Sequence, residues 1–383
     1  MNLTVKMNKN GSDGVSLRRE ASSMTVSQAK QTARAWVEAN AERWPGLRAA
    51  HLVGGITALP DEAPFPATKD VDLHLIFDEG SPALRGDGSG PNILEVPYGG
   101  VPIEAGIKSA AEYASPEVVL ANPEIAYHLT VDSVLVDPTG WLRDLQEPVR
   151  REYRRRRWVL ARLEHEQKGF DFALGLMSMV RETWGAAAEW NLLGYSTSFL
   201  AAALAVATLS PPRMGGRTFV HQRELLASYG RLDLHEAILD LLGVRYATPE
   251  RVDQLLWEGA EAFDLAVTVR RSPRPFLPFE HKLHAHLRPY LVDACQDMIA
   301  KGCHREALPW IGAFTTASTD LLLVDGPEDK RPMFAARLSG LLREVGFDTD
   351  AARAAKIEHV NQLRDRVFAL AAELVSANPG VID

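Results

Sequence analysis

Residues 52–77, LVGGITALPDEAPFPATKDVDLHLIF, decide the fold of the first half of this chain. Gly54 and Gly55 end a short apolar run, a proline-rich loop follows, and a strand-like run begins at Asp70. Side chains on a strand alternate between its faces, so Asp70 and Asp72 project from the same side, about 7 Å apart. Two carboxylates held this close on a rigid backbone are costly unless a cation lies between them.

This arrangement predicts a site for a metal ion and a phosphate group. Mg²⁺ prefers oxygen ligands such as those of Asp70 and Asp72, and it shares them with substrate phosphates. Glycines upstream let backbone N–H groups approach an anion closely. The alternative is that the two aspartates are solvated acids on an exposed strand face and that the glycines form a tight turn without a ligand.

The order of these parts resembles the signature of the nucleotidyltransferase superfamily that includes DNA polymerase β. That signature is an apolar residue, Gly, then Gly or Ser, a spacer of roughly ten residues, and Asp-x-Asp or Asp-x-Glu on a strand. Here the spacer is longer, and Lys69 stands where many members have serine. The layout of a small α/β domain before a helical domain resembles the antibiotic nucleotidyltransferases, of which kanamycin nucleotidyltransferase is one.

The resemblance implies a third carboxylate on a neighbouring strand. Glu104, in the alternating apolar run of residues 101–107, is the candidate, and Glu95 in the preceding run is its rival. Under this interpretation Asp70, Asp72 and Glu104 hold Mg²⁺.

The resemblance also implies residues that contact the nucleotide. Gly54, Gly55 and Thr57 are expected to hold the phosphates of a nucleoside triphosphate, and Lys69 either contacts phosphate or extends into solvent. His74 falls on the same strand face as the aspartates, and we interpret it as a half-buried histidine with its hydrogen bonds satisfied.

In antibiotic nucleotidyltransferases a glutamate of the helical domain acts as the general base on the acceptor hydroxyl. Residues 179–191 resemble the corresponding helix, and Glu182 and Glu189 are seven residues apart in it, which places them on one face of a continuous helix. Either glutamate is a candidate base, and the alternative is an ordinary ion pair. The lysine that such enzymes place nearby has no clear match in the sequence.

The hydrophobic pattern predicts an α+β protein of two domains. We expect a disordered leader over residues 1–25, an α/β nucleotidyltransferase domain with a small mixed sheet over 26–140, and a helical bundle over 141–383. In the first domain we expect a helix capped by Thr25 or Ser27 and running to about residue 43, strands over 48–53, 70–77 and 127–136, a hairpin over 93–107, and a helix over 109–120. The bundle is expected to hold six to eight helices, with breaks at 210–216, 243–249, 272–278 and 325–327.

Composition narrows the class of protein. The chain has 383 residues, a net charge of −8 and two cysteines, Cys295 and Cys303. This excludes a disulfide framework and argues against a broad nucleic-acid surface, which is usually basic. The longest apolar run, residues 199–209, is too short to cross a bilayer and reads as a buried helix. We therefore expect a cytoplasmic protein that does not contact a membrane.

Two further clusters, one of arginines and one of histidines, allow less specific interpretations. Residues 150–157, RREYRRRR, are read as one solvated helix with acidic partners, or else as a phosphate or RNA contact. Residues 280–286 hold three histidines, but only Glu280 and His284 have the i, i+4 spacing that would let them share a metal.

Taken with the resemblance, the sequence predicts transfer of a nucleoside monophosphate, AMP from ATP, to a hydroxyl of a small molecule. An aminoglycoside-like acceptor fits the acidic composition, because negative clefts attract cations. One rival is transfer to tRNA or to a protein side chain, as in toxin and antitoxin nucleotidyltransferases. The other is a regulatory protein that binds nucleotide without turnover. Small members of the group often complete the site with a second subunit, so a homodimer is a further expectation.

Overall fold

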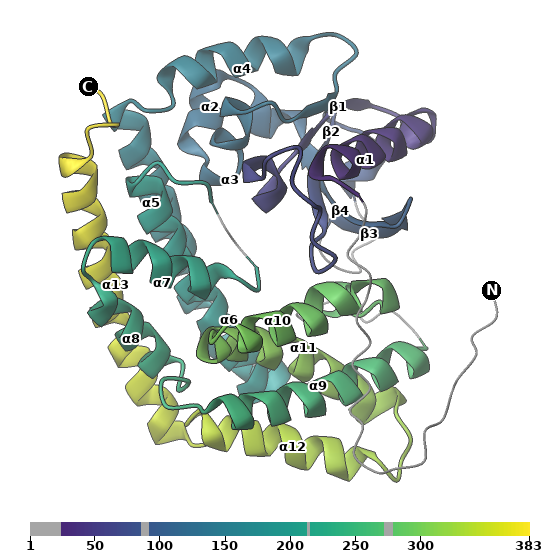
Figure 1. Cartoon of the computed structure of the whole chain (residues 1–383), viewed down its shortest axis with the longest axis vertical. Helices are drawn as coiled ribbons and strands as arrows, with labels where there is room; N and C mark the ends of the chain where they lie inside the picture. The colour runs from purple at the N-terminus through teal and green to yellow at the C-terminus, as the bar shows by residue number, and fades with distance from the viewer. Residues whose placement is uncertain (1–23, 86–91, 213–214, 272–278) are drawn as a thin grey trace.

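The chain forms a five-stranded mixed sheet with helices on both faces, followed by a larger part that is almost entirely helical (Figure 1). The computed structural model describes residues 24–85, 92–212, 215–271 and 279–383. The predicted α+β class is confirmed. Residues 1–23 of the predicted leader lie outside the described residues, but its last two do not: Phe65 N donates to Met24 O at 2.9 Å. Thr25 caps the first helix, so the folded part begins slightly earlier than predicted.

The sheet has the strand order β3-β4-β2-β1-β5. Only β2 and β4 pair in parallel, and the other three pairings are antiparallel. The predicted first strand, second strand and hairpin are all present. The strands are β1 (Leu47–Leu52), β2 (Val71–Phe77), β3 (Ile93–Tyr98), β4 (Val101–Ser109) and β5 (Val134–Val136).

One face of the sheet packs against helix α1 (Val26–Asn40). Alternate residues of β2, from Val71 to Phe77, lie in one hydrophobic cluster with Trp36 and Val37 of this helix. A capping box between Thr25 and Gln28 begins α1, so the expected cap is confirmed.

The opposite face of the sheet is apolar at one end and polar at the other. Ile76 of β2 packs with Tyr113 and with residues of α2 (Pro116–Ala121) and α4 (Trp141–Glu152). Toward the start of β2 the same face carries Asp72 and His74 instead. Since strand side chains alternate, the pattern of β2 itself places polar groups at this end.

The helical part contains ten α-helices among the described residues, more than the six to eight predicted. Several of them are short and separated only by a glycine turn, as at Gly230 and Gly302, so one periodic stretch contains two helices. The helices after α4 are α5 (Arg156–Gly175), α6 (Met177–Ala207), α7 (Thr218–Ser228), α8 (Leu232–Leu241), α9 (Pro249–Val269), α10 (Ala294–Ala300), α11 (His304–Asp325), α12 (Arg331–Glu344) and α13 (Asp350–Ala377). The predicted break at 272–278 lies outside the described residues.

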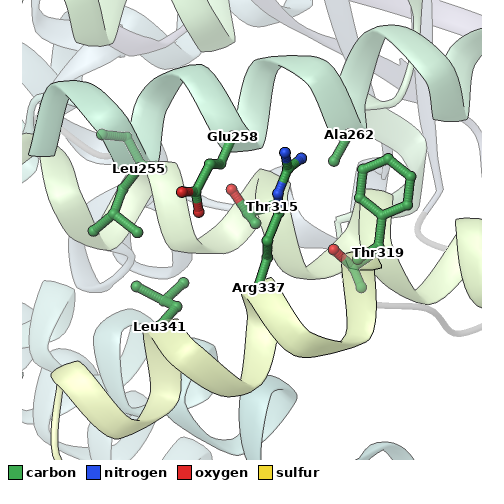
Figure 2. Close-up of a pocket in the computed structure, with 9 residues that line it drawn as sticks. Leu255, Glu258, Ala262, Thr315, Thr319, Arg337 and Leu341 are labelled. Atoms are coloured by element: carbon green, nitrogen blue, oxygen red, sulfur yellow. The ribbon is translucent and has the colours of Figure 1, made fainter. Parts of the chain in front are cut away.

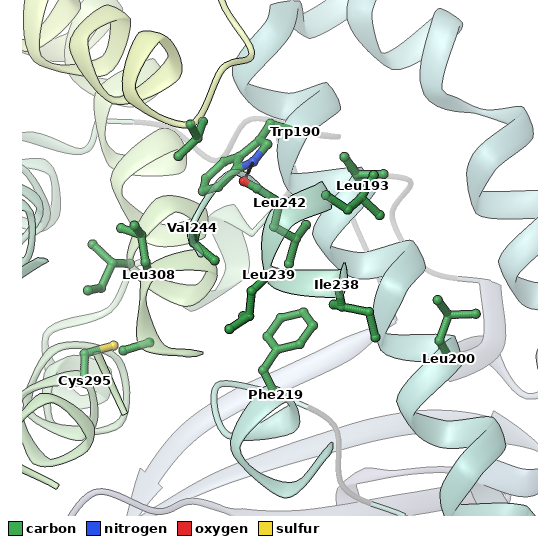
Figure 3. Close-up of a cluster of buried hydrophobic side chains, with 14 of the residues drawn as sticks. Trp190, Leu193, Leu200, Phe219, Ile238, Leu239, Leu242, Val244, Cys295 and Leu308 are labelled. Atoms are coloured by element: carbon green, nitrogen blue, oxygen red, sulfur yellow. Dashed lines mark hydrogen bonds between the residues drawn. The ribbon is translucent and has the colours of Figure 1, made fainter. Parts of the chain in front are cut away.

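The core of the helical part is built around α6, α8 and α11. Figure 3 shows Trp190 of α6 lying among leucines of these helices, with its indole Nε1 donating to Leu242 O at 3.1 Å. The second half of α6, which includes the apolar run 199–207, is largely buried. The prediction of a buried helix there is confirmed.

Two helices are long and apolar enough to cross a membrane by length and composition, α6 and α11. In each, 67% of the most apolar window is buried inside the protein. Such burial is what the core helices of a soluble protein show.

A small cavity lies between α9, α11 and α12 (Figure 2). It encloses about 10 Å³, room for a single water molecule. Thr315 lines it, and the buried Oγ1 of this residue has no hydrogen-bond partner in the structure. We interpret the cavity as a water site within the core.

Two predicted elements of the sheet part are wrong in extent. Residues 109–120 form a 3₁₀ turn, Ala110–Tyr113, and the short helix α2, because Ser109 and Ser115 each cap a new start. Residues 127–136 contain only the three-residue β5, preceded by a 3₁₀ turn, His128–Thr130. Thr130 Oγ1 donates to Tyr127 O at 2.6 Å, and such local hydrogen bonds compete with strand pairing.

Candidate functional site

Four carboxylates gather at the polar end of the sheet face opposite α1. Asp72 pairs directly with Glu104 across β2 and β4, and Glu104 pairs directly with Glu95 across β4 and β3. The three residues therefore form a row across three neighbouring strands, and Asp70 lies one pleat before it. Like charges directly opposite each other on a sheet are destabilising, so this row requires a compensating cation.

Asp70, Asp72 and Glu104 converge most closely. One carboxylate oxygen from each lies within 4.8 Å of the others. Among the residues that the structure describes, they form the one such group of three or more potential ligands. Asp70 Oδ2 is buried and accepts no hydrogen bond from any described residue, and the Lys282 ammonium is 3.9 Å away. An all-carboxylate set with an unsatisfied buried oxygen suits a hard divalent cation such as Mg²⁺.

The protonation of these groups reflects their burial. The pKa of Asp72 is raised to about 7, chiefly by burial and also by the Asp70 carboxylate, while Lys282 and Lys69 act in the opposite direction. The pKa of Glu95 is also raised to about 7, again chiefly by burial. Burial raises the pKa of Asp70 in the same sense. A cation that entered the site would compete with protons at neutral pH.

A lysine of the helical part supplies positive charge to the site. Lys282, in a 3₁₀ turn after α9, forms an ion pair with Glu104, and its Nζ lies 2.5 Å from Glu95 Oε1 and 3.9 Å from Asp70 Oδ2. Its side chain is only 6% exposed. A buried ammonium is tolerated only with carboxylates around it, so the lysine and the row stabilise each other.

Other residues of the helical part approach the same site. Arg217 Nη2 donates to Thr68 Oγ1 at 3.1 Å, two residues before Asp70. The Tyr290 ring lies 5.2 Å from Lys282 Nζ. Phe279 has φ 73°, a conformation that side chains rarely adopt, and its carbonyl accepts from Lys282 N. Such strain is held only where the surrounding structure fixes it.

The two glycines have different surroundings. Gly54 has φ 64°, and a Cβ atom added there would lie 2.8 Å from Asp72 Cγ and closer still to Oδ2. The turn and the Asp72 carboxylate thus occupy the space in which any other residue would have its side chain. At Gly55 an added Cβ would meet Lys69 Nζ at 2.6 Å, the mobile end of a long side chain. The predicted neighbourhood of glycine turn, Asp72 and Lys69 is therefore present.

Thr57 is engaged within the protein. Its hydroxyl donates to Gly54 O at 2.8 Å and lies 3.0 Å from His128 Nδ1. It closes the 3₁₀ turn Gly54–Ala58 that follows β1. Its predicted contact with phosphate stays a prediction.

His74 belongs to a buried polar network behind the carboxylates. Its Nδ1 and His51 Nε2 each lie 2.8 Å from the Tyr113 hydroxyl, and His51 Nδ1 lies 3.0 Å from Leu52 O. Burial lowers the pKa of His51 to about 4 and that of His74 well below its usual range. Both are neutral at pH 7, so the interpretation of His74 as a satisfied histidine is confirmed, although it is more deeply buried than expected.

The two glutamates proposed as general base do not share a face. Gly185 has φ 85° and ψ −178° and interrupts α6 between them, so the two-turn spacing of Glu182 and Glu189 does not apply. Glu182 is exposed, whereas Glu189 is buried with its Oε2 3.5 Å from Arg353 Nε on α13. In Figure 1 the start of α13 lies at the opposite corner of the molecule from the strands.

Comparisons with protein-family models, with curated proteins and with solved structures find no match for this chain. The site is therefore interpreted from its own residues. Sequence reasoning missed Lys282, Arg217 and Tyr290, which lie more than 100 residues beyond β4 and join the site only through folding. Residues 280–286 contributed this lysine rather than the histidine metal cluster considered as an alternative.

Proposed function

We propose that this protein is a metal-dependent nucleotidyltransferase that resembles the antibiotic nucleotidyltransferases. It would transfer a nucleoside monophosphate, AMP from ATP, to a hydroxyl of a small molecule such as an aminoglycoside-like acceptor. The observation that carries the proposal is the convergence of Asp70, Asp72 and Glu104 beside the Gly54 turn. These are the parts expected from the sequence, and they lie on one face of one sheet.

The metal assignment rests on the chemistry of the donor set. Three carboxylates with oxygens within 4.8 Å of one another, and a buried oxygen that accepts no hydrogen bond from the described residues, fit Mg²⁺ held by Asp70, Asp72 and Glu104. When bound, Mg²⁺ neutralises triphosphate charge and lowers the pKa of an attacking hydroxyl.

The protein also places cationic side chains at the carboxylate site. Lys69 lies against Gly55, Lys282 lies among the carboxylates, and Arg217 reaches the loop before Asp70. Ammonium and guanidinium groups are the usual partners of phosphate oxygens. Antibiotic nucleotidyltransferases place a lysine near the glutamate base, and the sequence alone offered no match for it; Lys282, which pairs with Glu95, is a candidate for that lysine.

Glu95 is the most suitable proton acceptor by position. It lies beside Glu104 in the strand row, and burial raises its pKa to about 7. A general base works best when its pKa is near the working pH. We therefore add Glu95 to Glu182 and Glu189, which remain predictions from the resemblance.

The test is titration calorimetry of the full chain with ATP, GTP, CTP and UTP, with and without Mg²⁺. We expect metal-dependent binding of one nucleotide, lost in Asp72→Asn. Asp61→Asn is the matched control, since Asp61 is an exposed carboxylate that pairs with Lys30 away from the row. Binding that persists in Asp72→Asn, or that needs no divalent ion, would refute the metal assignment.

One observation favours the non-catalytic rival. Lys282 already places a positive charge among the carboxylates, as a bound cation would. A regulatory protein with a lysine in permanent place of the metal would bind Mn²⁺ only after Lys282→Met. An enzyme would bind Mn²⁺ with Lys282 intact. Mn²⁺ titration of the wild type and of Lys282→Met therefore distinguishes the two functions.

A further inference from the structure

An open cleft of about 530 Å³ lies where the sheet part, the end of α6 and the C-terminal end of the chain meet. This volume falls within the range of ordinary small-molecule sites, roughly 300–1,000 Å³. The cleft is formed by none of the carboxylate-site residues. Its lining includes Arg150 of α4, Tyr153 and Arg154 of the turn after it, and Asn378 at the end of α13.

The two arginines of the cleft are held by backbone carbonyls. Arg150 donates from Nε to Thr130 O and from Nη2 to Val131 O, each at 3.2 Å. Arg154 donates from Nε to Gly380 O at 2.7 Å. These contacts fix the guanidinium planes, but they leave other N–H donors of both groups without a partner among the described residues and do not neutralise their charge.

The neighbouring arginines form ion pairs, in contrast to Arg150 and Arg154. The expected single helix over residues 150–157 is wrong, because the run spans the end of α4, a turn and the start of α5. Arg155 and Arg157 pair with Glu152, and Arg156 pairs with Asp383. In the described part of the chain neither Arg150 nor Arg154 has a carboxylate within ion-pair distance, and the cleft lining contains no acidic residue.

A hydroxyl group adds to this donor set. The Tyr153 hydroxyl makes no hydrogen bond to any described residue, although the rest of the side chain is buried. Its ring is fixed between the Arg162 guanidinium, 4.2 Å from the ring centre, and the Tyr127 ring at 6.3 Å. The donor is therefore positioned before any ligand arrives.

One wall of the cleft is a strained residue. Leu209 has φ 59° and closes α6 in a turn that usually takes glycine, with Ser210 N donating to Ala205 O at 2.9 Å. The Leu209 side chain packs against both the helical core and the cluster under the sheet. Its packing fixes the wall at the junction of the two hydrophobic clusters.

We propose that this cleft binds a small phosphorylated molecule, with its phosphate between Arg150 and Arg154 and the Tyr153 hydroxyl as a third donor. Two guanidinium groups and a hydroxyl lining one cleft offer more donors than a planar carboxylate accepts, and they suit a tetrahedral dianion. The remaining volume accepts the organic part of the ligand. In a protein with a net charge of −8, two unpaired arginines facing one cleft form a local site for an anion. This site is independent of the proposed nucleotidyltransferase centre.

The experiment is titration calorimetry of the full chain, without divalent metal, using inorganic phosphate, pyrophosphate, AMP, glucose 6-phosphate and citrate as probes. We expect at least one phosphate probe to bind with Kd below about 1 mM. Arg150→Gln and Arg154→Gln should each weaken it about tenfold or more, the usual effect of losing a hydrogen bond to a charged group. Arg151→Gln is the matched control, because Arg151 is exposed, pairs with Glu152 and does not line the cleft.

Two further variants distinguish the loss of a ligand contact from a folding defect and from binding at the carboxylate site. Tyr153→Phe keeps the buried ring and removes only the hydroxyl, and it should weaken the same probe severalfold. Asp72→Asn should leave the binding unchanged. The proposal is overturned if no phosphate probe binds at a concentration ten times the expected Kd, or if citrate binds more tightly than every phosphate probe. It is also overturned if Arg154→Gln and Arg151→Gln bind the phosphate probe with equal affinity.

Discussion

Replacing one of the two adjacent glycines should damage the carboxylate site, while replacing the other should not. Gly54→Ala must hold alanine at φ 64°, which costs about 1–2 kcal/mol in the left-handed region. Its Cβ would also lie 2.8 Å from Asp72 Cγ, whereas ordinary contacts begin near 3.4 Å. The carboxylate must therefore move by at least about half an ångström.

That displacement separates ligand oxygens that now lie within 4.8 Å of one another. We expect Gly54→Ala to lower the free energy of unfolding by about 2–3 kcal/mol, from backbone strain and the contact together. Because the three carboxylates must converge on one ion, Mn²⁺ affinity should fall about tenfold or more, equivalent to about 1.4 kcal/mol. In Gly55→Ala only the Lys69 ammonium must swing away, so the loss of stability should stay below about 1 kcal/mol.

The assay is urea denaturation of the wild type and both variants, with Mn²⁺ titration calorimetry on the same samples. Equal stability of Gly54→Ala and Gly55→Ala would refute the strain argument. Wild-type Mn²⁺ affinity in Gly54→Ala would refute the link between this turn and the Asp72 carboxylate.

Three more predictions concern substitutions of single residues elsewhere in the protein and at the carboxylate site. Lys282→Met leaves the carboxylate row without its ammonium and should lower the free energy of unfolding by about 3–5 kcal/mol in metal-free buffer, with Mn²⁺ restoring part of it; an unchanged urea midpoint would contradict the ion pairs. Burial, with a smaller contribution from another glutamate, raises the pKa of Glu166 to about 8, so the folded state keeps this proton and stability falls as pH rises from about 4.5 to 8. Glu166→Gln should therefore be more stable than the wild type by up to about 4–5 kcal/mol at pH 8 and equal to it near pH 4.5, as thermal melts across this range would show; a constant difference would contradict the pKa. In α12, Gly340→Ala meets open space and should stabilise the protein by about 0.5–1 kcal/mol, whereas Gly312→Ala places a Cβ 2.6 Å from Trp190 Cη2 and should destabilise it by about 1–3 kcal/mol, both measured by urea denaturation. The opposite ranking of the two glycine variants would refute the packing around Trp190.

Local sequence determined the elements that hold the first two carboxylates. The alternation of residues 70–77 placed Asp70 and Asp72 on one face, and the glycines marked the turn before them, because side-chain alternation and left-handed backbone are local properties. The hairpin of β3 and β4 followed from two apolar runs around Gly99 and Gly100. Strand register then put Glu104 opposite Asp72, at the position expected from the resemblance.

Errors arose where local signals were ambiguous. The helix containing Glu182 and Glu189 is interrupted at Gly185, and its periodic pattern continues across the break, so spacing alone misplaced the two glutamates. The arginine run 150–157 is rich in good helix formers, but its turn is set by contacts with the C-terminal end of the chain, where Arg156 N donates to Ile382 O at 2.7 Å. No window of neighbouring residues contains that information.

The tertiary structure alone decided which distant groups complete the two sites. Lys282 reaches Glu104 across 178 residues of sequence, and Arg154 reaches Gly380 across 226. The sequence alone does not distinguish a buried charged residue from an exposed one, because burial depends on what packs over the residue. The chain by itself specified the strands and their carboxylates. The packing of the helical part against the sheet decided that a lysine would lie among those carboxylates and that two arginines would face an open cleft with no acidic partner among the described residues.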